Sequence, residues 1–228
     1  MASYSLISAQ ALQATASSVT FSSIPSTYTD LVIVCQPIST ISSGTDNLKF
    51  QFNGDTGTNY SRNWAVGNNA SSYGSGKNVS FASIVDGDVF NTAGCTFSMQ
   101  IFNYANSSNY RFAIFKNGNN ASSSSAVDFG VARWANNSAA INSINISSYA
   151  GNSLAAGSTF YLYGIVANGA PKATGGTIST DGVYWYHTFG STSAFVPNTS
   201  ITADILVVAG GGGGGECTSG YTNRAAGG

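Results

Sequence analysis

The chain has 228 residues, of which 43% are hydrophobic and 7% are charged, and its formal net charge is −1. With eight lysine and arginine residues and no basic cluster, the composition argues against nucleic-acid binding through phosphate neutralisation. No apolar run approaches the roughly 18 residues of a membrane helix, and the first residues, MASYSLISAQ, lack the basic and apolar regions of a signal peptide. We therefore expect no membrane insertion, and no routing into a secretion pathway by the chain itself.

Uncharged polar residues replace the charged ones that most soluble domains carry. Ser, Thr and Asn side chains compete for backbone hydrogen bonds, and Gly costs backbone entropy in a helix. A chain so rich in these residues is therefore expected to form strands and turns rather than helices.

The cysteines are odd in number and widely spaced, at Cys35, Cys95 and Cys217. This spacing predicts neither a disulfide scaffold nor a zinc site. Cys35 and Cys95 lie within apolar strand patterns, so we interpret them as small buried hydrophobic residues.

The first third of the chain contains three segments with strand patterns, after a polar lead-in to which no element is assigned. They are residues 19–21, the continuous apolar run 31–35 and the alternating run 48–52. The run 31–35 is expected to be covered on both faces, because it has no polar side. A turn is predicted at residues 53–57, and residues 58–76, which show no clear period, are predicted to form a long surface loop that carries at most a short strand.

The next hundred residues continue with alternating apolar patterns. A hairpin is predicted from residues 96–104 and 110–116, and further strands are predicted at 79–84, 127–134, 141–146 and 160–167. About eight short strands without a helix of length are typical of a two-sheet sandwich. We therefore predict an all-β fold, with a jelly-roll-like antiparallel β-sandwich domain over residues 1–168.

A second, smaller unit is predicted after this domain. Residues 169–176, with the sequence GAPKATGG, lack apolar periodicity and are predicted to be a linker. A small β unit follows at 177–209, and a glycine-rich segment at 210–228. The expected core of the small unit is Tyr184, Tyr186, Phe195, Ile205 and Val207. A core of this size is marginal alone, so we expect the unit to depend on a neighbour, such as another copy of the chain.

No catalytic constellation is evident. The single histidine, His187, could be joined only by Asp181 or Asp204, and no nucleophile elbow of the GxSxG type is present. Asp86 and Asp88 are the closest carboxylate pair, and a turn or a calcium-ligand cluster are the two interpretations of that DGD sequence. The glycine run at 210–215 lacks the lysine of a phosphate-binding loop, which leaves a flexible linker or a packed polyglycine module. We predict no catalytic residue, cofactor or metal site.

Exposed aromatic residues are the best candidates for ligand contact. Tyr60, Trp64 and Tyr73 lie in the predicted long loop, and Trp185 and His187 lie in the small unit. Aromatic rings stack on sugar rings while Asn and Ser side chains hydrogen-bond the hydroxyl groups, and the alternative for each ring is ordinary core packing.

Several phrases of the sequence resemble a known family. They are VTFSSIPSTYTD at 19–30, DNLKFQFNGDTGTNYS at 46–61 and IFNYANSSNY at 101–110. These resemble the β-sandwich domain of many tailed-phage virion proteins. Residues 186–215 are similar to the entrance of the glycine-rich domain in phage tail-fibre and related surface proteins.

The resemblance implies a structural protein of a phage virion, assembled in the host cytoplasm. The leading interpretation is a fibre or fibre-associated adhesin that contacts a host surface glycan or envelope protein. A capsid decoration or head-fibre protein is the alternative, and a polysaccharide-degrading enzyme is a third. The resemblance also implies a homotrimer that contacts other virion proteins.

Overall fold

The computed structural model describes residues 3–42, 44, 46–67, 71–83, 90–119, 127–166, 171–180, 184–198 and 200–208. The described residues up to 166 belong to one compact unit, and those from 171 onwards belong to a second. Every regular element among the described residues is a β-strand, which confirms the predicted all-β class.

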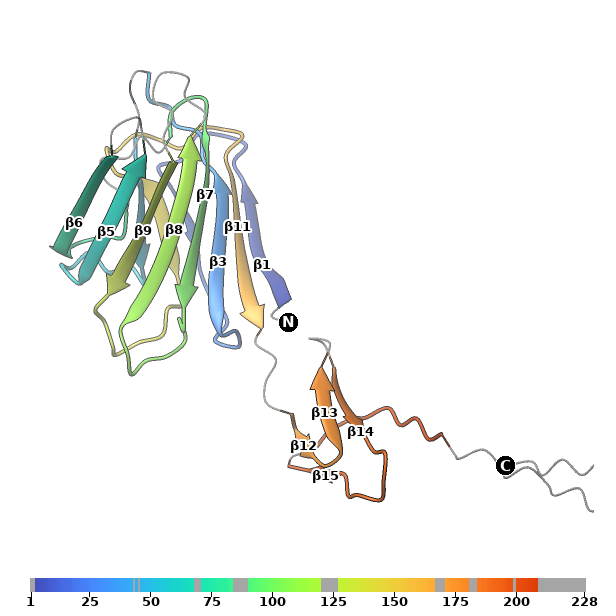
Figure 1. Ribbon diagram of the computed structural model, residues 1–228. Coiled ribbons are helices and arrows are strands. Elements are labelled where there is room, and N and C mark those ends of the chain that lie inside the picture. The colour runs from blue at the N-terminus through green and yellow to red at the C-terminus, as the bar shows by residue number, and fades with distance from the viewer. Residues whose placement is uncertain are drawn as a thin grey trace, which may run out of the picture. The chain divides into compact units, whose positions relative to one another are not determined.

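The first unit is a sandwich of two antiparallel sheets of unequal size (Figure 1). The larger sheet has eight strands in the order β1-β11-β3-β7-β8-β9-β5-β6, and the smaller has three in the order β2-β10-β4. The strands are β1 (Ser3–Ala11), β2 (Ser18–Phe21), β3 (Asp30–Gln36), β4 (Leu48–Phe52), β5 (Tyr60–Gly67), β6 (Ser71–Val79), β7 (Cys95–Phe102), β8 (Arg111–Asn119), β9 (Val127–Trp134), β10 (Ile144–Ser148) and β11 (Thr159–Val166).

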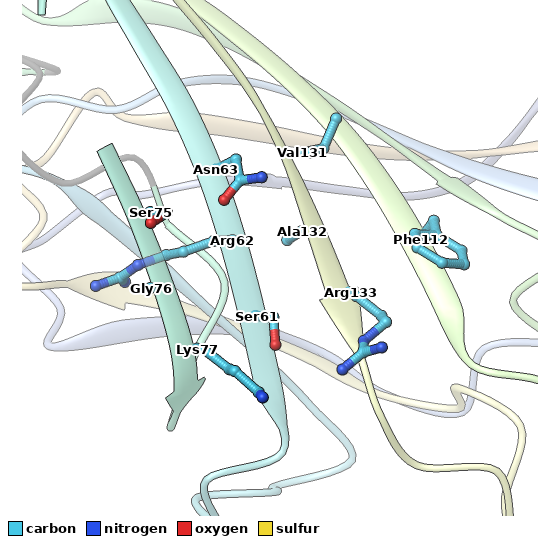
Figure 2. Close-up of a pocket in the computed structure, with 10 residues that line it drawn as sticks. All are labelled: Ser61, Arg62, Asn63, Ser75, Gly76, Lys77, Phe112, Val131, Ala132 and Arg133. Carbon is cyan, nitrogen blue, oxygen red and sulfur yellow. The ribbon is translucent and has the colours of Figure 1, made fainter. Parts of the chain in front are cut away.

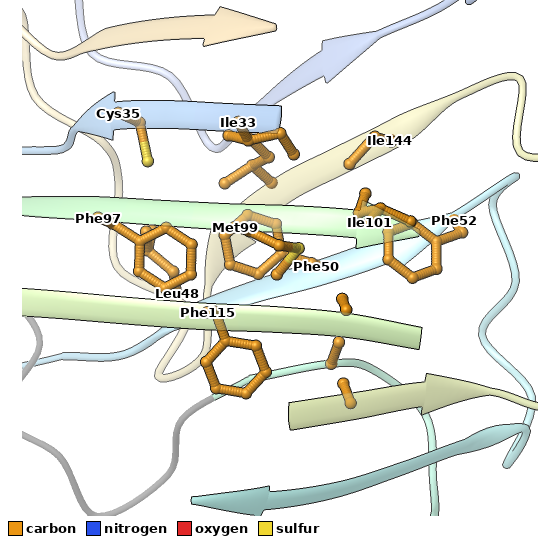
Figure 3. Packing of buried hydrophobic residues seen from close by; sticks show 14 of the residues in the cluster. Ile33, Cys35, Leu48, Phe50, Phe52, Phe97, Met99, Ile101, Phe115 and Ile144 are labelled. Atoms are coloured by element: carbon orange, nitrogen blue, oxygen red, sulfur yellow. The ribbon is translucent and has the colours of Figure 1, made fainter. Parts of the chain in front are cut away.

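The core lies between the two sheets and follows the alternation of the sequence. In β4, Leu48, Phe50 and Phe52 are buried while Lys49 and Gln51 between them are half-buried. Their partners in the larger sheet include Ile33, Cys35, Phe97, Met99, Ile101 and Phe115 (Figure 3). The Phe50 and Phe97 rings are stacked with centroids 4.9 Å apart, so aromatic stacking joins the two layers at the centre of the core.

Strand β3 is covered on both faces, as its unbroken apolar sequence predicts. Leu31, Ile33 and Cys35 face the core, and Val32 is also buried although it alternates with them. Val32 is paired with Tyr163 of β11, whose large ring is next to it on the opposite face of the sheet. The neighbouring tyrosine supplies the cover that a second layer would otherwise provide.

The prediction for residues 58–76 is wrong, and a strand forms where none was predicted. Most of the described residues of 58–76 lie in the paired strands β5 and β6 rather than in a loop, and the polar lead-in forms the edge strand β1. In β5 the inward row contains Arg62 between aromatic residues, and in β6 it contains Gly74 and Gly76, so neither strand shows a plain apolar period. Of the predicted strand 79–84, Val79 ends β6 and Ala82 makes a single bridge to Phe50.

The turn after β4 forms as predicted and anchors a buried aromatic cluster. Asn53 and Gly54 both have positive φ, 52° and 67°, which their residue types tolerate. The Asp55 carboxylate then accepts hydrogen bonds from Trp134 Nε1 at 2.7 Å, from the Asn59 side chain and from the Gly57 backbone. Partial burial acts to raise the pKa of Asp55, but these three hydrogen bonds outweigh it and lower the pKa below its usual value.

We expect this carboxylate to make the fold sensitive to acid. Because the folded-state pKa lies below the unfolded one, the ionised form stabilises the fold above the unfolded pKa, and that contribution is lost as pH falls through the folded pKa. Denaturant unfolding of the wild type and of Asp55→Asn at pH 7 and at about pH 3 should therefore show the larger loss of stability in the wild type. Equal losses in the two proteins would contradict the role given to Asp55.

Gly130 of β9 leaves room for the side chain of a neighbouring strand. A Cβ atom there would lie 2.5 Å from the Phe115 ring and 2.6 Å from the backbone oxygen of Asn63. Since a backbone atom cannot move aside, Gly130→Ala is expected to lower the free energy of unfolding by about 1–3 kcal/mol. Gly118→Ala in β8 is the matched control, because nothing lies within 4 Å of the added atom. Similar unfolding midpoints in denaturant for the two variants would disprove the packing argument.

The second unit contains β12 (Ala173–Thr174), β13 (Thr177–Thr180), β14 (Trp185–Thr188) and β15 (Val196–Pro197). Strand β12 pairs with β15, and β13 with β14. The predicted linker 169–176 therefore contains a strand, because Ala173 is buried and Thr174 pairs with Val196.

The core predicted for this unit does not form within one copy of the chain. The side chains of Tyr184, Tyr186 and Phe195 are 40–63% exposed, and those of Ile205 and Val207 are 85% and 83% exposed. Residues 201–208, which belong to the predicted small β unit 177–209, have no strand partner among the described residues. The apolar alternation is present, but a strand needs a neighbour to bury it.

Candidate functional site

The outer face of the larger sheet, opposite the core, is the most distinctive surface of the described first unit. We use the name outer face for the part of this surface that is formed by strands β5, β6, β8 and β9. Its side chains alternate along each strand with the buried ones. Five apolar residues on it are between 44% and 73% exposed: Phe112, Ile114, Val127, Phe129 and Val131. Cross-strand pairing of Phe112 with Arg133 and of Ile114 with Val131 makes them neighbours rather than scattered single residues.

The two faces of β8 and β9 have an unusual distribution of polarity. Arg111, Asn117 and Asp128 lie on the inward side and are buried, whereas Phe112 and Phe129 face outward. The Arg111 guanidinium lies 5.2 Å from the Trp134 ring, and one of its nitrogens donates to the backbone oxygens of Asn109 and Asn136. Burial lowers the pKa of Arg111. The apolar residues outside are thus not needed for the core of a single copy.

A groove of about 380 Å³ lies on the outer face where β5, β6 and β9 run side by side (Figure 2). The pairing register builds it in rows. Ser61 of β5 is paired with Lys77 on one side and Arg133 on the other, and the adjacent row joins Ser75, Asn63 and Val131. Phe112 lines the groove beside Arg133, and Figure 2 shows the end of Lys77 beside Ser61 and the guanidinium of Arg133 over β9, on the other side of Ser61. The outward side chains of the groove therefore combine two cations, hydroxyl and amide groups, and one aromatic ring.

Two of the predicted ligand-contact residues belong to the core. Tyr60 is fully buried, its hydroxyl accepts a hydrogen bond from the Phe52 backbone and donates one to the Asp55 carbonyl, and burial raises its pKa. Trp64 is 8% exposed and its ring lies against Gly74, where a Cβ atom would meet it at 2.3 Å. Their segment is a strand between β9 and β6 and not a loop, and both rings point into the core, so these two rings stabilise the fold and do not reach a ligand.

The other three predicted contact residues are at least partly accessible. Tyr73 lies on the outer face, paired with Ala65, and is 89% exposed. In the second unit, Trp185 and His187 lie two positions apart in β14. Trp185 is 36% exposed, and His187 is partly buried. The His187 ring packs edge-on to Phe195, and its Nδ1 lies 2.8 Å from the carbonyl oxygen of Gly175, so it has a structural role between β12 and β15.

The groove residues were not predicted from the sequence, because they are distant along the chain. Ser61, Lys77 and Arg133 become neighbours only through the order β9-β5-β6. Where successive residues are all hydrophobic, as in 112–115, the sequence does not indicate which side chains face outward and which face the core. Only the strand register shows which row is outside.

The cysteines behave as the sequence indicates. Cys35 and Cys95 are buried and form no disulfide. Burial raises the pKa of both thiols, that of Cys95 to about 12, so both are protonated and unreactive at neutral pH. Cys217, Asp86, Asp88 and the glycine run lie outside the described residues.

Within the part of the chain that the structure describes, no three His, Cys, Asp or Glu residues gather as a metal site would require. The same residues include no helix with the length and apolar character needed to cross a membrane. No protein-family model, curated protein or solved structure matches the chain.

Proposed function

We propose that the chain is a non-enzymatic structural protein of a tailed-phage virion, displayed on the particle surface as a fibre or fibre-associated adhesin that contacts the host. The sequence phrases at 19–30, 46–61 and 101–110 support the virion assignment by resemblance. The observation that carries the contact role is the outer face, where apolar side chains that the core does not use lie beside a polar groove.

The architecture suits binding rather than chemistry. The outer face is formed by four neighbouring strands whose backbone hydrogen bonds fix the spacing of every outward side chain. Binding to such a surface costs little conformational entropy, because its groups are already in place. Exposed aromatic rings beside amides and hydroxyls are the combination that recognises sugars and other amphipathic surfaces.

The second unit supports assembly from several copies. Its four-residue apolar run from Ile205 to Val208 is 82–87% exposed. An exposed apolar run that no neighbouring strand covers is stabilised by contact with another chain. We propose that copies of the chain cover it in a homotrimer, and that other virion proteins hold the trimer on the particle.

Immunogold labelling of purified particles that carry this chain tests the proposed function. Antibody raised against the isolated chain should label intact particles, in a few to a few tens of copies on the tail. Labelling in hundreds of copies on the head would instead assign the chain to capsid decoration. Protein found in lysates of infected cells but never on particles would contradict both.

A further inference from the structure

We propose that the groove on the outer face binds an anionic sugar unit, namely a sugar residue within a glycan that carries a carboxylate or phosphate group. The proposal rests on the proposed contact with the host surface and gives it a ligand class. Its basis is a pair of cations, Lys77 and Arg133, which the strand register places on either side of Ser61.

Neither cation is neutralised within the described chain. Lys77 is exposed, and no carboxylate of the described residues lies within ion-pair distance of it or of Arg133. Arg133 instead lies 5.2 Å from the Tyr110 ring, and its Nε atom is buried without a hydrogen-bond acceptor. Because solvent does not reach this Nε, contact with a ligand falls to the other nitrogens of the Arg133 guanidinium, which are not among the buried atoms without a partner.

The two cations are complementary to a single anionic group. A guanidinium presents a planar pair of donors that matches a carboxylate or phosphate, and an ammonium adds a compact positive charge. Figure 2 shows the charged ends of Lys77 and Arg133 on the two sides of Ser61, with Arg62 directed towards β6. The Ser61 hydroxyl lies between them in register and can donate to the same anion.

The rest of the groove fits the sugar that would carry this anion. Asn63 and Ser75 are exposed, are paired across β5 and β6, and offer donors and acceptors to ring hydroxyls. The Phe112 ring lines the groove beside Arg133 and provides an apolar surface for the face of a sugar ring. The volume of about 380 Å³ lies at the lower end of the roughly 300–1,000 Å³ typical of small-ligand sites.

A nucleic acid is a poorer fit to the same charges. Tight binding of a phosphate backbone needs many phosphate contacts along a basic stripe. Here the outward side chains of the groove include two cations, and the chain as a whole has a net charge of −1. A glycan that supplies one anion and several hydroxyl groups uses the complete set of groove residues.

Calorimetric titration of the full chain with two matched polymers tests the proposal. The probes are a polyuronate and the same polymer after chemical reduction of its carboxylates to neutral alcohols. We expect binding of the polyuronate that weakens at high salt, and binding of the reduced polymer that is about tenfold weaker or more, since a hydrogen bond to a charged group contributes on that order. A poly(glycerol phosphate) probe distinguishes phosphate from carboxylate as the preferred anion.

Variants assign the effect to the groove. Lys77→Ala and Arg133→Ala should each weaken polyuronate binding about tenfold, and Arg133→Lys should recover part of the loss. Lys49→Ala removes the same charge from β4 in the other sheet and should bind like the wild type. Thermal unfolding of all variants checks that each is folded, and the Lys77 side chain is exposed, so its removal should not affect the fold.

Three results would overturn the proposal: equal binding of the charged and reduced polymers, no binding of any polymer, or tighter binding of single-stranded DNA than of any glycan. Those results would leave labelling of particle surfaces, and with it the proposed function, intact. Conversely, groove-dependent binding by a protein that is absent from particles would uphold the ligand class and refute the virion role.

Discussion

Trp134→Ala is expected to lower the free energy of unfolding of the sandwich by about 3–5 kcal/mol, the range for a buried Trp reduced to Ala. The indole is 1% exposed and packs against Phe52 and Tyr60, with ring centroids 5.7 and 6.4 Å away. Its Nε1 also donates to the Asp55 carboxylate at 2.7 Å. The substitution therefore removes a large apolar volume and one of the hydrogen bonds that hold the turn after β4.

Two further variants separate these contributions in denaturant unfolding. Trp134→Phe keeps an aromatic ring and removes the hydrogen bond, and it should cost about 1–3 kcal/mol. Tyr73→Ala removes an aromatic ring that is 89% exposed and should change stability by less than about 0.5 kcal/mol. A loss in Trp134→Ala no greater than that in Tyr73→Ala would show that the cluster does not support the core.

Replacing Ile205 and Val207 together with aspartate is expected to convert the proposed trimer into monomers. Both side chains are more than 80% exposed in one copy, and they lie two positions apart in the segment 200–208. Two charges placed in a shared apolar interface would have to be buried without partners, which costs several kcal/mol per ion. The assembly would lose that free energy at every interface.

Light scattering coupled to size-exclusion chromatography measures the mass of the assembly. The control is Thr202→Asp with Ala203→Asp, which adds the same two charges to the same segment and keeps the large apolar side chains. The wild type and the control should elute with three times the chain mass and the Ile205/Val207 variant with one. A wild type that is monomeric at micromolar concentration would contradict the assembly proposal.

The fold class could be predicted because the apolar residues of a half-buried strand recur at every second position. In β4 and β7 every second residue is apolar, and these residues are the buried ones. β5 escaped prediction because Arg62 occupies an inward position, where its guanidinium lies 5.4 Å from the Trp64 ring and 4.6 Å from the Phe81 ring. A cation stabilised by aromatic rings looks, in sequence, like a surface residue.

The candidate site could be predicted only in part, because it depends on which face of a strand is outside. Tyr73 is the one predicted contact residue that lies exposed on the outer face. In β9 the more apolar of the two alternating sets of side chains is Val127, Phe129 and Val131. This set faces outward, whereas Gly130 and Trp134 belong to the set that faces the core. Gly130 is inward because the Phe115 ring needs its space, which is a property of the neighbouring strand and not of the local sequence.

In the proposed function, the chain contacts its target through the outer face of the larger sheet. Hydrogen–deuterium exchange, measured by mass spectrometry with and without envelope glycan from a susceptible host, tests this contact. We predict slower exchange in peptides that cover β5, β6, β8 and β9, and no change in residues 177–208. Slower exchange confined to residues 177–208, with the four strands unaffected, would contradict the claim and place the contact on the second unit.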